Sequence, residues 1–509
     1  MQMDLQPNLQ LALCSRPRSE SDAPPGTSRR EMKLVLACRG PAVNQVVAAL
    51  SSGLAFAGVM SPWAFPSVAL GQLTEEGSGV HLTRGQQEWF TNLPLFLLIP
   101  GSVAGGALAE LLGPRTLLLL LTPLLTAAMA AMHFVSYRQV QDAGLAELLL
   151  LATRVLQGAS AALMNPIVSV YLCEVAEERF RGTLASLVDA WGTFGFLLTY
   201  IMGSFLAWHS LALVLPACLL VPAFLGLLAS QESPLWLARK GKEKEALRAF
   251  EMLRSSPEDM AKEFDSATAS EEGASCWETA RMLVRKSHLV PIAVSMFLLQ
   301  AKELSGNNAV LIYMPQIFQL AGVGMPPSTS SIVVMATRLG CNFVGSALLH
   351  RLPRKYLMLA GAALSTAATS ALGAFFFVQG RGDDVALLSW LPMTALLAFT
   401  VGVSVGVGPA SWLVAAEILP HRVRSLGFGI GVTGYSLASF LVSMTFERVR
   451  GAWGSHGLFW SYSAGCVVYA LHVLLAVPET RGRSLAEIED AWGRRSSART
   501  RGACEAAPA

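Results

Sequence analysis

Charged residues are scarce in this sequence. Asp, Glu, Lys and Arg make up 14% of the 509 residues, whereas 53% are hydrophobic. A soluble domain has about 25% charged residues, which supply much of the polar surface that it exposes to water. The shortage excludes a disordered chain, a nucleic-acid-binding protein and an ordinary cytosolic enzyme. We therefore expect most of the chain to lie in a lipid bilayer.

Patterns for metals, disulfides and nucleotides are also missing. The eight cysteines form no CxxC pair and no Cys/His cluster with metal-ligand spacing, so we expect neither a disulfide framework nor a zinc site. No GxSxG element or Walker loop occurs, which argues against an enzyme. We expect no metal and no cofactor. The N-terminus lacks the pattern of a cleaved signal peptide.

Long apolar runs predict the membrane-spanning helices. At a rise of 1.5 Å per residue, about 20 residues cross a hydrocarbon core of about 30 Å. Eight such runs carry no charge and four carry one or two. The twelve runs are 43–67, 89–109, 116–137, 148–173, 182–208, 210–231, 289–318, 328–349, 356–380, 385–416, 425–446 and 452–478. We predict an all-α membrane protein with twelve transmembrane helices. Charges interrupt the run 289–318, so that this stretch determines whether the number is twelve.

The distribution of basic residues predicts the orientation. If both termini are cytosolic, 30 of the 38 lysines and arginines fall on the cytosolic side and five on the other. We expect a cytosolic tail (1–42), a six-helix half (43–230), a cytosolic linker (231–288), a second half (289–479) and a second tail (480–509). Residues 241–256 have the pattern of an amphipathic helix, and a solvated linker is the alternative.

Three local patterns recur at separations of 240 to 247 residues. They pair residues 108–115 with 348–355, Glu174 and Arg181 with Glu417 and Arg424, and Glu232 with Glu479. Because the three matches occur in the same order and at nearly the same separation, they predict that a unit of six spans is duplicated, with both copies in the same orientation. Parallel repeats build transporters whose halves rock around a central site.

Several motifs together resemble the sugar-porter family of the major facilitator superfamily, over about residues 43–490. They are Arg154-x-x-x-Gly158, Tyr171-x-x-Glu174, Arg181-Gly182, Glu232-Ser-Pro-Leu-Trp-Leu237, Leu304-Ser-Gly-Asn-Asn308, Gly406-Val-Gly-Pro409-x-x-Trp412, Glu417-Ile-Leu-Pro420 and Val477-Pro-Glu-Thr-Arg-Gly-Arg-Ser-Leu-Ala-Glu-Ile488. Ser61-Pro62-x-x-x-Pro66 and Gln87-x-Trp89 further resemble the arthropod facilitated trehalose transporters and the class III glucose transporters. The resemblance implies the major facilitator fold in a multi-pass, plasma-membrane transporter.

The implied function is alternating-access transport of a sugar such as trehalose or a hexose. Proton-coupled members of the family commonly carry an aspartate in the first span. Residues 43–67 contain no acid, so facilitated diffusion is favoured, with proton binding at Asp189 or Glu303 as the alternative. A porter of a different, charged solute and a non-transporting sugar sensor are the other readings. Neither the oligomeric state nor any macromolecular partner follows from the sequence.

The expected substrate site departs from the family pattern. Asp189 stands where the family usually has glutamine, Lys302-Glu303 where it has a glutamine pair, and Arg338 where it often has asparagine. The resemblance assigns substrate binding to Asp189, Lys302, Glu303, Asn308, Arg338, Trp412 and Tyr435.

Charges inside a membrane span are costly, by about 2.5–3.5 kcal/mol on insertion scales. We therefore expect Asp189 to pair with Lys302, directly or through water, and Glu303 with Arg338. Neutralised pairs favour a sugar or polyol, whereas an unpaired Lys302 or Arg338 favours an anion. The alternative is a structural role, in which these charges only hold helices together.

Charges at the cytosolic span ends form a second candidate set. We expect them to pair across the two halves when the inner gate closes, at about 0–1 kcal/mol per exposed pair. Topogenic charge with local helix-end pairing is the alternative. The set consists of Glu110, Arg115, Arg154, Glu174, Arg181, Glu232, Arg354, Glu417, Arg424 and Glu479.

Overall fold

Helices account for nearly all regular structure, because backbone groups in an apolar solvent must find hydrogen-bond partners within their own segment. The structure is a computed structural model that describes residues 40–73, 82–136, 143–254, 260, 263–264, 286–383, 385–420, 423–483 and 487. Both predicted tails lie largely outside the described residues, as does most of the linker after Arg254.

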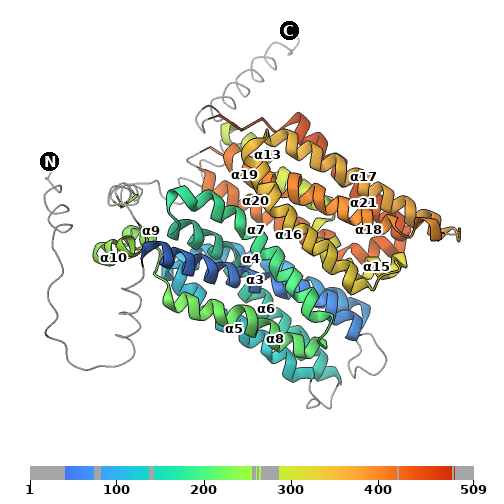
Figure 1. Cartoon of the computed structure of the whole chain (residues 1–509), viewed down its shortest axis with the longest axis horizontal. Helices are drawn as coiled ribbons and strands as arrows, with labels where there is room; N and C mark the ends of the chain where they lie inside the picture. Colours follow the sequence, from blue (N-terminus) through green and yellow to red (C-terminus); the bar gives the residue numbers. More distant parts are fainter. Residues whose placement is uncertain are drawn as a thin grey trace, which may run out of the picture. The chain divides into compact units, whose positions relative to one another are not determined.

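Six long helices form the N-half. They are α3 (Pro41–Leu73), α4 (Arg84–Leu112), α5 (Pro114–Ser136), α6 (Ala143–Val175), α7 (Glu178–Gly203) and α8 (Trp208–Ala229). Two linker helices follow, α9 (Pro234–Arg239) and α10 (Glu243–Leu253). In Figure 1 these elements run from blue to green.

The C-half is more interrupted. Its helices are α13 (Lys286–Leu304), α14 (Asn307–Ile312), α15 (Met314–Ala321), α16 (Pro327–Arg351), α17 (Arg354–Gly380), α18 (Leu391–Val401), α19 (Gly408–Ile418), α20 (Arg424–Met444) and α21 (Phe446–Leu475). A 3₁₀ turn, η2 (Ala386–Leu388), precedes α18, and a π-helix, η3 (Gly402–Val407), joins α18 to α19. These elements run from yellow to red in Figure 1.

Among the described residues, eleven helices are long and apolar enough to span a membrane. The apolar stretch Leu187–Gly203 of α7 is the twelfth candidate. The predicted run 289–318 is broken into α13, α14 and α15. The break lies at Gly306, whose φ of 77° suits glycine and where a Cβ would lie 2.5 Å from the Tyr462 ring.

The same helix pairs pack in both halves. In the N-half, α3 packs on α7 and α8, α4 on α6, and α5 on α6 and α8. In the C-half, α13 packs on α20 and α21, α16 on α18 and η3, and α17 on α18, η3 and α21. The correspondence supports the predicted parallel duplication.

Two carboxylates repeat the symmetry at helix N-termini. Glu232 accepts hydrogen bonds from the backbone N–H groups of Arg115 and Thr116, at 2.8 and 3.0 Å, in the first turn of α5. Glu479 accepts them from Arg354 and Lys355, at 3.2 and 3.0 Å, in the first turn of α17. Each carboxylate satisfies N–H groups that have no partner within their helix and meets the positive end of its dipole.

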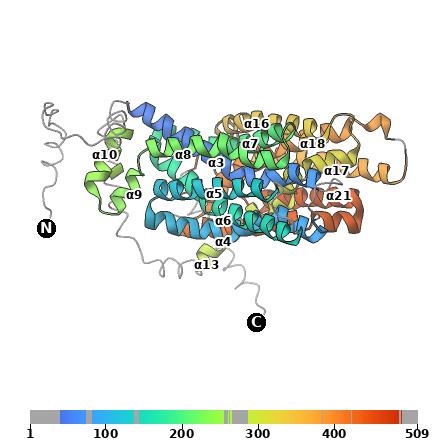
Figure 2. The ribbon, with the colours of Figure 1, turned by 90° about the horizontal axis from the view of Figure 1, so that it is seen from below.

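The end of the bundle where α8 ends and α13 begins is called here the linker end, and the end where α3 ends and α4 begins is called the far end. The amphipathic pattern over 241–256 is confirmed by α10, which buries Ala246, Ala249, Phe250 and Leu253. Helix α10 packs on α3 and α9 at the linker end (Figure 2). The side-chain amides of Asn44 and Gln45 donate to the carbonyls of Met252 and Leu253.

The halves meet through α4 against α20 and α7 against α16. One hydrophobic cluster includes residues of both halves, among them Phe65, Tyr200 and Tyr313. A separate cluster that includes Leu298, Val414 and Tyr469 belongs to the C-half alone. The two halves therefore share part of one core, which places any polar group at their junction in a largely apolar setting.

Candidate functional site

Four of the charged residues inside the spans belong to the predicted substrate site. Lys302 and Glu303 occupy the last turn of α13 and are 5% and 1% exposed. Arg338 lies in α16 and is 9% exposed. Asp189 lies in α7 and its side chain is exposed. Three of the four are thus buried, and Asp189 and Arg338 lie on α7 and α16, which pack together across the junction of the halves.

The Lys302 ammonium lies over two aromatic rings. Its Nζ is 5.2 Å from the ring centroid of Trp412, in α19, and 5.2 Å from that of Tyr435, in α20. The two rings are 5.0 Å apart and nearly edge to face, at 65°. A desolvated cation–π contact contributes about 2 kcal/mol, so two faces offset much of the cost of a lysine in a span.

Amide and hydroxyl groups extend this site toward Arg338. Asn308 donates to the Tyr435 hydroxyl at 3.1 Å and to Ser439 at 2.7 Å. Asn307 donates to the side-chain oxygen of Asn308 at 3.1 Å and accepts from Arg338 Nη1 at 3.2 Å. One chain of hydrogen bonds therefore connects Arg338 with the aromatic pair that holds Lys302.

The predicted direct ion pairs are not formed. Within the described part of the chain, neither Lys302 nor Arg338 lies within 4.0 Å of a carboxylate oxygen. The aromatic faces hold the Lys302 ammonium, and the Asn307 amide holds Arg338. Glu303 and Asp189 still act on Lys302 through their electrostatic fields. Both oxygens of Glu303 are enclosed and lack a hydrogen bond of normal geometry, although Asn307 and Ser439 lie near its carboxyl.

Asp189 marks a polar contact between the halves. The Asn342 side chain, in α16, donates to Thr193 Oγ1 at 2.8 Å and to the Asp189 carbonyl at 3.3 Å. The Asp189 carboxylate itself forms no salt bridge with any described residue. Asn342 was not predicted from the sequence, although a polar residue four positions after Arg338, on the same helix face, was a usable signal.

Further polar and aromatic contacts join the halves toward the far end. Tyr200 donates to the Leu311 carbonyl at 2.5 Å, and Asn92 donates to the Tyr313 hydroxyl at 3.4 Å. Arg448 pairs with Glu88 at 3.2 Å. Trp89 and Phe96 lie 6.2 and 5.3 Å from Phe440 across the junction, and within the C-half Tyr313 stacks on Phe446 at 4.2 Å. The sequence patterns missed this set, because nothing in one sequence shows which helices face each other.

At the linker end, by contrast, the ion pairs between described residues join the N-half to the linker or lie within the C-half. Glu174 pairs with Arg239 at 2.9 Å, Glu110 with Lys240 at 3.2 Å, and Arg354 with Glu417. No hydrogen bond or ion pair between described residues joins the two halves there. Among the described residues, the expected pairing across the halves is therefore not formed, and the contacts between the halves lie from the middle of the bundle to the far end.

Several of the predicted charges make local contacts instead. Arg115 donates to the carbonyls of Leu227 and Leu228, and Arg424 donates to that of Leu419. Glu232 and Glu479 cap α5 and α17. The Arg181 side chain lies outside the described residues.

Arg154 differs from the other predicted gating residues, because it is fully buried within α6. It donates to the Phe90 carbonyl at 2.8 Å and to Gln157 at 2.9 Å, and it lies over the Phe90 ring at 5.0 Å. Its Nη2 has no partner among the described residues. Among the described residues no carboxylate forms an ion pair with Arg154, so its role in a gating salt bridge stays a prediction.

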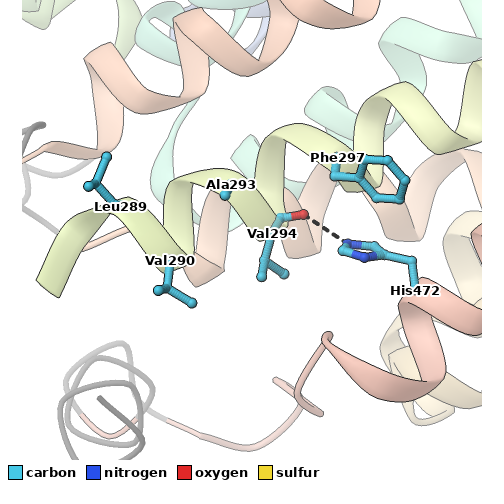
Figure 3. A pocket seen from close by; sticks show the side chains of 6 residues that line it. All are labelled: Leu289, Val290, Ala293, Val294, Phe297 and His472. Carbon is cyan, nitrogen blue, oxygen red and sulfur yellow. Dashed lines mark hydrogen bonds between the residues drawn. The ribbon is translucent and has the colours of Figure 1, made fainter. Parts of the chain in front are cut away.

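A groove of about 390 Å³ lies elsewhere, between α13 and α21 (Figure 3). It is lined by Leu289, Val290, Ala293, Val294, Phe297 and His472. His472 Nε2 lies 3.1 Å from the Val294 carbonyl oxygen. The remaining lining is apolar and lacks the convergent polar groups that a sugar requires, so the groove is not the candidate site.

The comparison with protein families decides the assignment. The model of the family described as "Sugar (and other) transporter" matches residues 46–492. The chain belongs to the sugar transporter family. It is therefore a multi-pass membrane protein and a transporter, and the expectation that it is not an enzyme is confirmed by its family.

Curated relatives are insect transporters. The chain is 33% identical over 459 residues to the facilitated trehalose transporter Tret1-2 homolog of Drosophila simulans, covering 88% of this chain and 92% of the relative. It is 32% identical over 450 residues to the facilitated trehalose transporter Tret1 of Culex quinquefasciatus, covering 88% and 85%. It spans about half the length of other relatives, such as 51% of Tret1 of Drosophila yakuba.

Solved structures confirm the fold. The inward-open xylose transporter XylE from E. coli matches with a TM-score of 0.71 and 21% identity, covering 88% of this chain and 99% of that one. XylE bound to 6-bromo-6-deoxy-D-glucose matches equally well, at 0.71 and 21%. The sugar transporter described here thus has the twelve-helix major facilitator fold.

Proposed function

We propose that the chain carries a sugar such as trehalose or a hexose by facilitated diffusion, with alternating access to a site at the junction of its halves. The observation that carries the proposal is the polar and aromatic cluster of Lys302, Asn308, Trp412 and Tyr435, set between α13, α14, α19 and α20. Hydroxyl groups of a sugar find donors and acceptors there, and an indole face suits its apolar C–H surface.

The distribution of contacts supports alternating access. In this conformation the polar contacts between the halves come from Glu88, Asn92, Thr193, Tyr200, Asn342 and their partners, none of which lies at the linker end. The linker end holds charges that pair with the linker or within the C-half. Rocking of the halves would exchange these two patterns. The linker end carries most basic residues, so we place it and both termini in the cytosol, in a plasma-membrane protein.

Facilitated diffusion is favoured over proton coupling by two features. Helix α3 contains no acidic residue between Pro41 and Leu73. Arg154, a buried cation of the N-half, contacts the Phe90 carbonyl, the Gln157 side chain and the Phe90 ring, so its described partners include no carboxyl that could exchange a proton. A proton-coupled cycle needs a carboxyl that exchanges a proton near the substrate path. Among the described residues of the candidate site, Asp189 and Glu303 are the carboxyls that such a cycle would use, and the response of uptake to a protonophore tests them.

Uptake into proteoliposomes tests the proposal. The panel should contain trehalose, glucose, a polyol and an organic anion, with and without a proton gradient. We expect sugar uptake that stops at equilibrium with the outside and does not respond to a protonophore. Accumulation above the external concentration that collapses with the gradient would contradict facilitated diffusion.

A site variant and a matched control sharpen the assay. Asn308→Ala removes the donor to Tyr435 and Ser439 and should reduce sugar uptake. Leu475→Ala, at a position 78% exposed on the outer surface of α21, should leave uptake unchanged. Equal uptake by the wild type and Asn308→Ala would remove this cluster as the sugar site, and no uptake of any sugar would favour a sensor.

A further inference from the structure

Two cations of the candidate site keep unused hydrogen-bond donors. Lys302 has three ammonium N–H groups, and its contacts in the described part of the chain are aromatic faces. Arg338 has five N–H groups, of which one on Nη1 donates, to the amide oxygen of Asn307. The rings stabilise a positive charge without neutralising it, and an amide accepts a hydrogen bond without supplying a counter-ion.

Buried cations in proteins are normally paired with an anion. The acids in this region do not supply one by contact, because neither Glu303 nor Asp189 lies within 4.0 Å of either cation. Glu303 is 1% exposed and both its oxygens are enclosed. Lys302 and Arg338 retain more exposure, at 5% and 9%. Asp189, on α7 of the N-half, is the most exposed of the four charged groups, whereas the charges that a solute can reach in the C-half cluster are the cations Lys302 and Arg338.

The position of Lys302 also affects how a ring of a sugar could bind. Its ammonium lies over the face of Trp412, where a neutral sugar would stack. To bind a neutral sugar on the indole, the ammonium would have to give up its contacts with two aromatic faces and would gain only hydroxyl groups as hydrogen-bond acceptors. A carboxylate offers a charge-assisted hydrogen bond, which is about twice as strong as a neutral one, and would draw the ammonium away from the indole.

We propose that the site accepts a sugar that carries a carboxylate, of the uronate or aldonate class, with Lys302 and Arg338 receiving the carboxylate and Trp412 stacking on the sugar ring. The hydrogen-bonded chain of Asn307, Asn308 and Tyr435 connects Arg338 with one of the two rings that hold Lys302. The inference rests on the proposed sugar-transport function and specifies its substrate class. Lys302 and Arg338 are thereby specificity-determining residues.

The test compares glucuronate with glucose, which share one ring skeleton and differ in charge. Uptake of each labelled compound is measured in proteoliposomes that contain the wild type, Lys302→Gln or Arg338→Gln. We expect glucuronate uptake by the wild type and a loss of at least about tenfold in each variant, a difference of about 1.4 kcal/mol. Glucose uptake should fall less than glucuronate uptake in both variants, because glucose loses only a donor to a hydroxyl group, whereas glucuronate loses a charge-assisted hydrogen bond.

Lys242→Gln is the matched control, since Lys242 is exposed in the linker and lies 5.5 Å from the centroid of the Trp236 ring. It should transport both compounds like the wild type. As a second readout that does not require a complete transport cycle, glucuronate should raise the Tm of the wild type more than glucose does, and this difference should vanish in Lys302→Gln.

The outcomes separate the two proposals. Uptake of glucose without uptake of, or competition by, glucuronate would overturn the anionic substrate class and leave sugar transport standing. Equal glucuronate uptake by the wild type and both variants would overturn the roles of Lys302 and Arg338. Folded wild type that transports neither compound, nor trehalose, would overturn the proposed function itself.

Discussion

Tyr200→Phe is the sharpest probe of the contact between the halves. Tyr200 is 1% exposed, and its hydroxyl donates to the Leu311 carbonyl across the junction at 2.5 Å. The substitution removes one oxygen and leaves the ring in place. A buried hydrogen bond contributes about 0.5–1.5 kcal/mol net, and an acceptor left without a partner adds about 1–3 kcal/mol.

We therefore expect Tyr200→Phe to destabilise the present conformation, relative to one in which the far end opens, by about 1–2 kcal/mol. This corresponds to a change of about 5- to 30-fold in the ratio of the two conformations. Spin labels at Gly85 in α4 and Gly451 in α21 would report it. Both positions are exposed, and they lie at the start of their helices on opposite halves. The population at longer distance should increase.

Tyr171→Phe is the matched control. Tyr171 is fully buried, and its hydroxyl donates to the Gln231 carbonyl at 2.7 Å within the N-half. The control should lower stability without moving the distance distribution. If Tyr200→Phe leaves the distribution unchanged, or Tyr171→Phe changes it as much, the reasoning about the junction is refuted.

Two further predictions concern the duplicated architecture and its close packing. Glu479→Ala removes the acceptor for the backbone N–H groups in the first turn of α17, and Glu232→Ala does the same for α5. Each should lower the free energy of unfolding by about 1–3 kcal/mol, measured as a Tm lower by a few degrees. A loss in one variant alone would argue against equivalent roles. Gly406→Ala places a Cβ 2.4 Å from the Leu357 carbonyl oxygen, so it should lower the free energy of unfolding by about 1–3 kcal/mol and reduce transport. Gly429→Ala is the control, because its Cβ would meet no atom within 4 Å. Equal transport by both variants would show that η3 tolerates the strain.

Hydrophobic runs and charge placement were sufficient to predict the fold. Because each span must satisfy its backbone groups and cross a fixed thickness, the apolar runs predicted every spanning helix. Run length alone did not show that 289–318 breaks at Gly306, or that 385–416 contains the π-helix η3. The first break depends on a close approach to Tyr462, a residue distant in the sequence.

The candidate site was predicted in its members but not in its pairings. Lys302, Asn308, Trp412 and Tyr435 do lie together, and the resemblance to a known family placed them there. Opposite charges suggested ion pairs, yet the Lys302 ammonium lies on aromatic faces. The choice between a carboxylate and a ring depends on side-chain distances of a few ångströms, which spacing along a sequence does not determine.

The gating charges illustrate a related limit. Their spacing correctly marked helix ends, and Glu232 and Glu479 indeed occupy equivalent positions at the starts of α5 and α17. Which charges meet depends on the conformation, and in this one Glu174 pairs with Arg239 of the linker and Glu417 with Arg354 of its own half. The same sequence adopts every conformation of the transport cycle, so the spacing of its charges does not show in which conformation a given pair is in contact.

Sugar counterflow tests the central claim most directly. Proteoliposomes loaded with unlabelled sugar are diluted into a trace of the labelled sugar, with a protonophore present. We predict transient accumulation of label by the wild type and its loss in Asn308→Ala, because exchange through one alternating site needs no gradient of protons. Absence of counterflow with every sugar tested, or counterflow equal in the wild type and Asn308→Ala, would contradict a sugar site at the junction of the two halves.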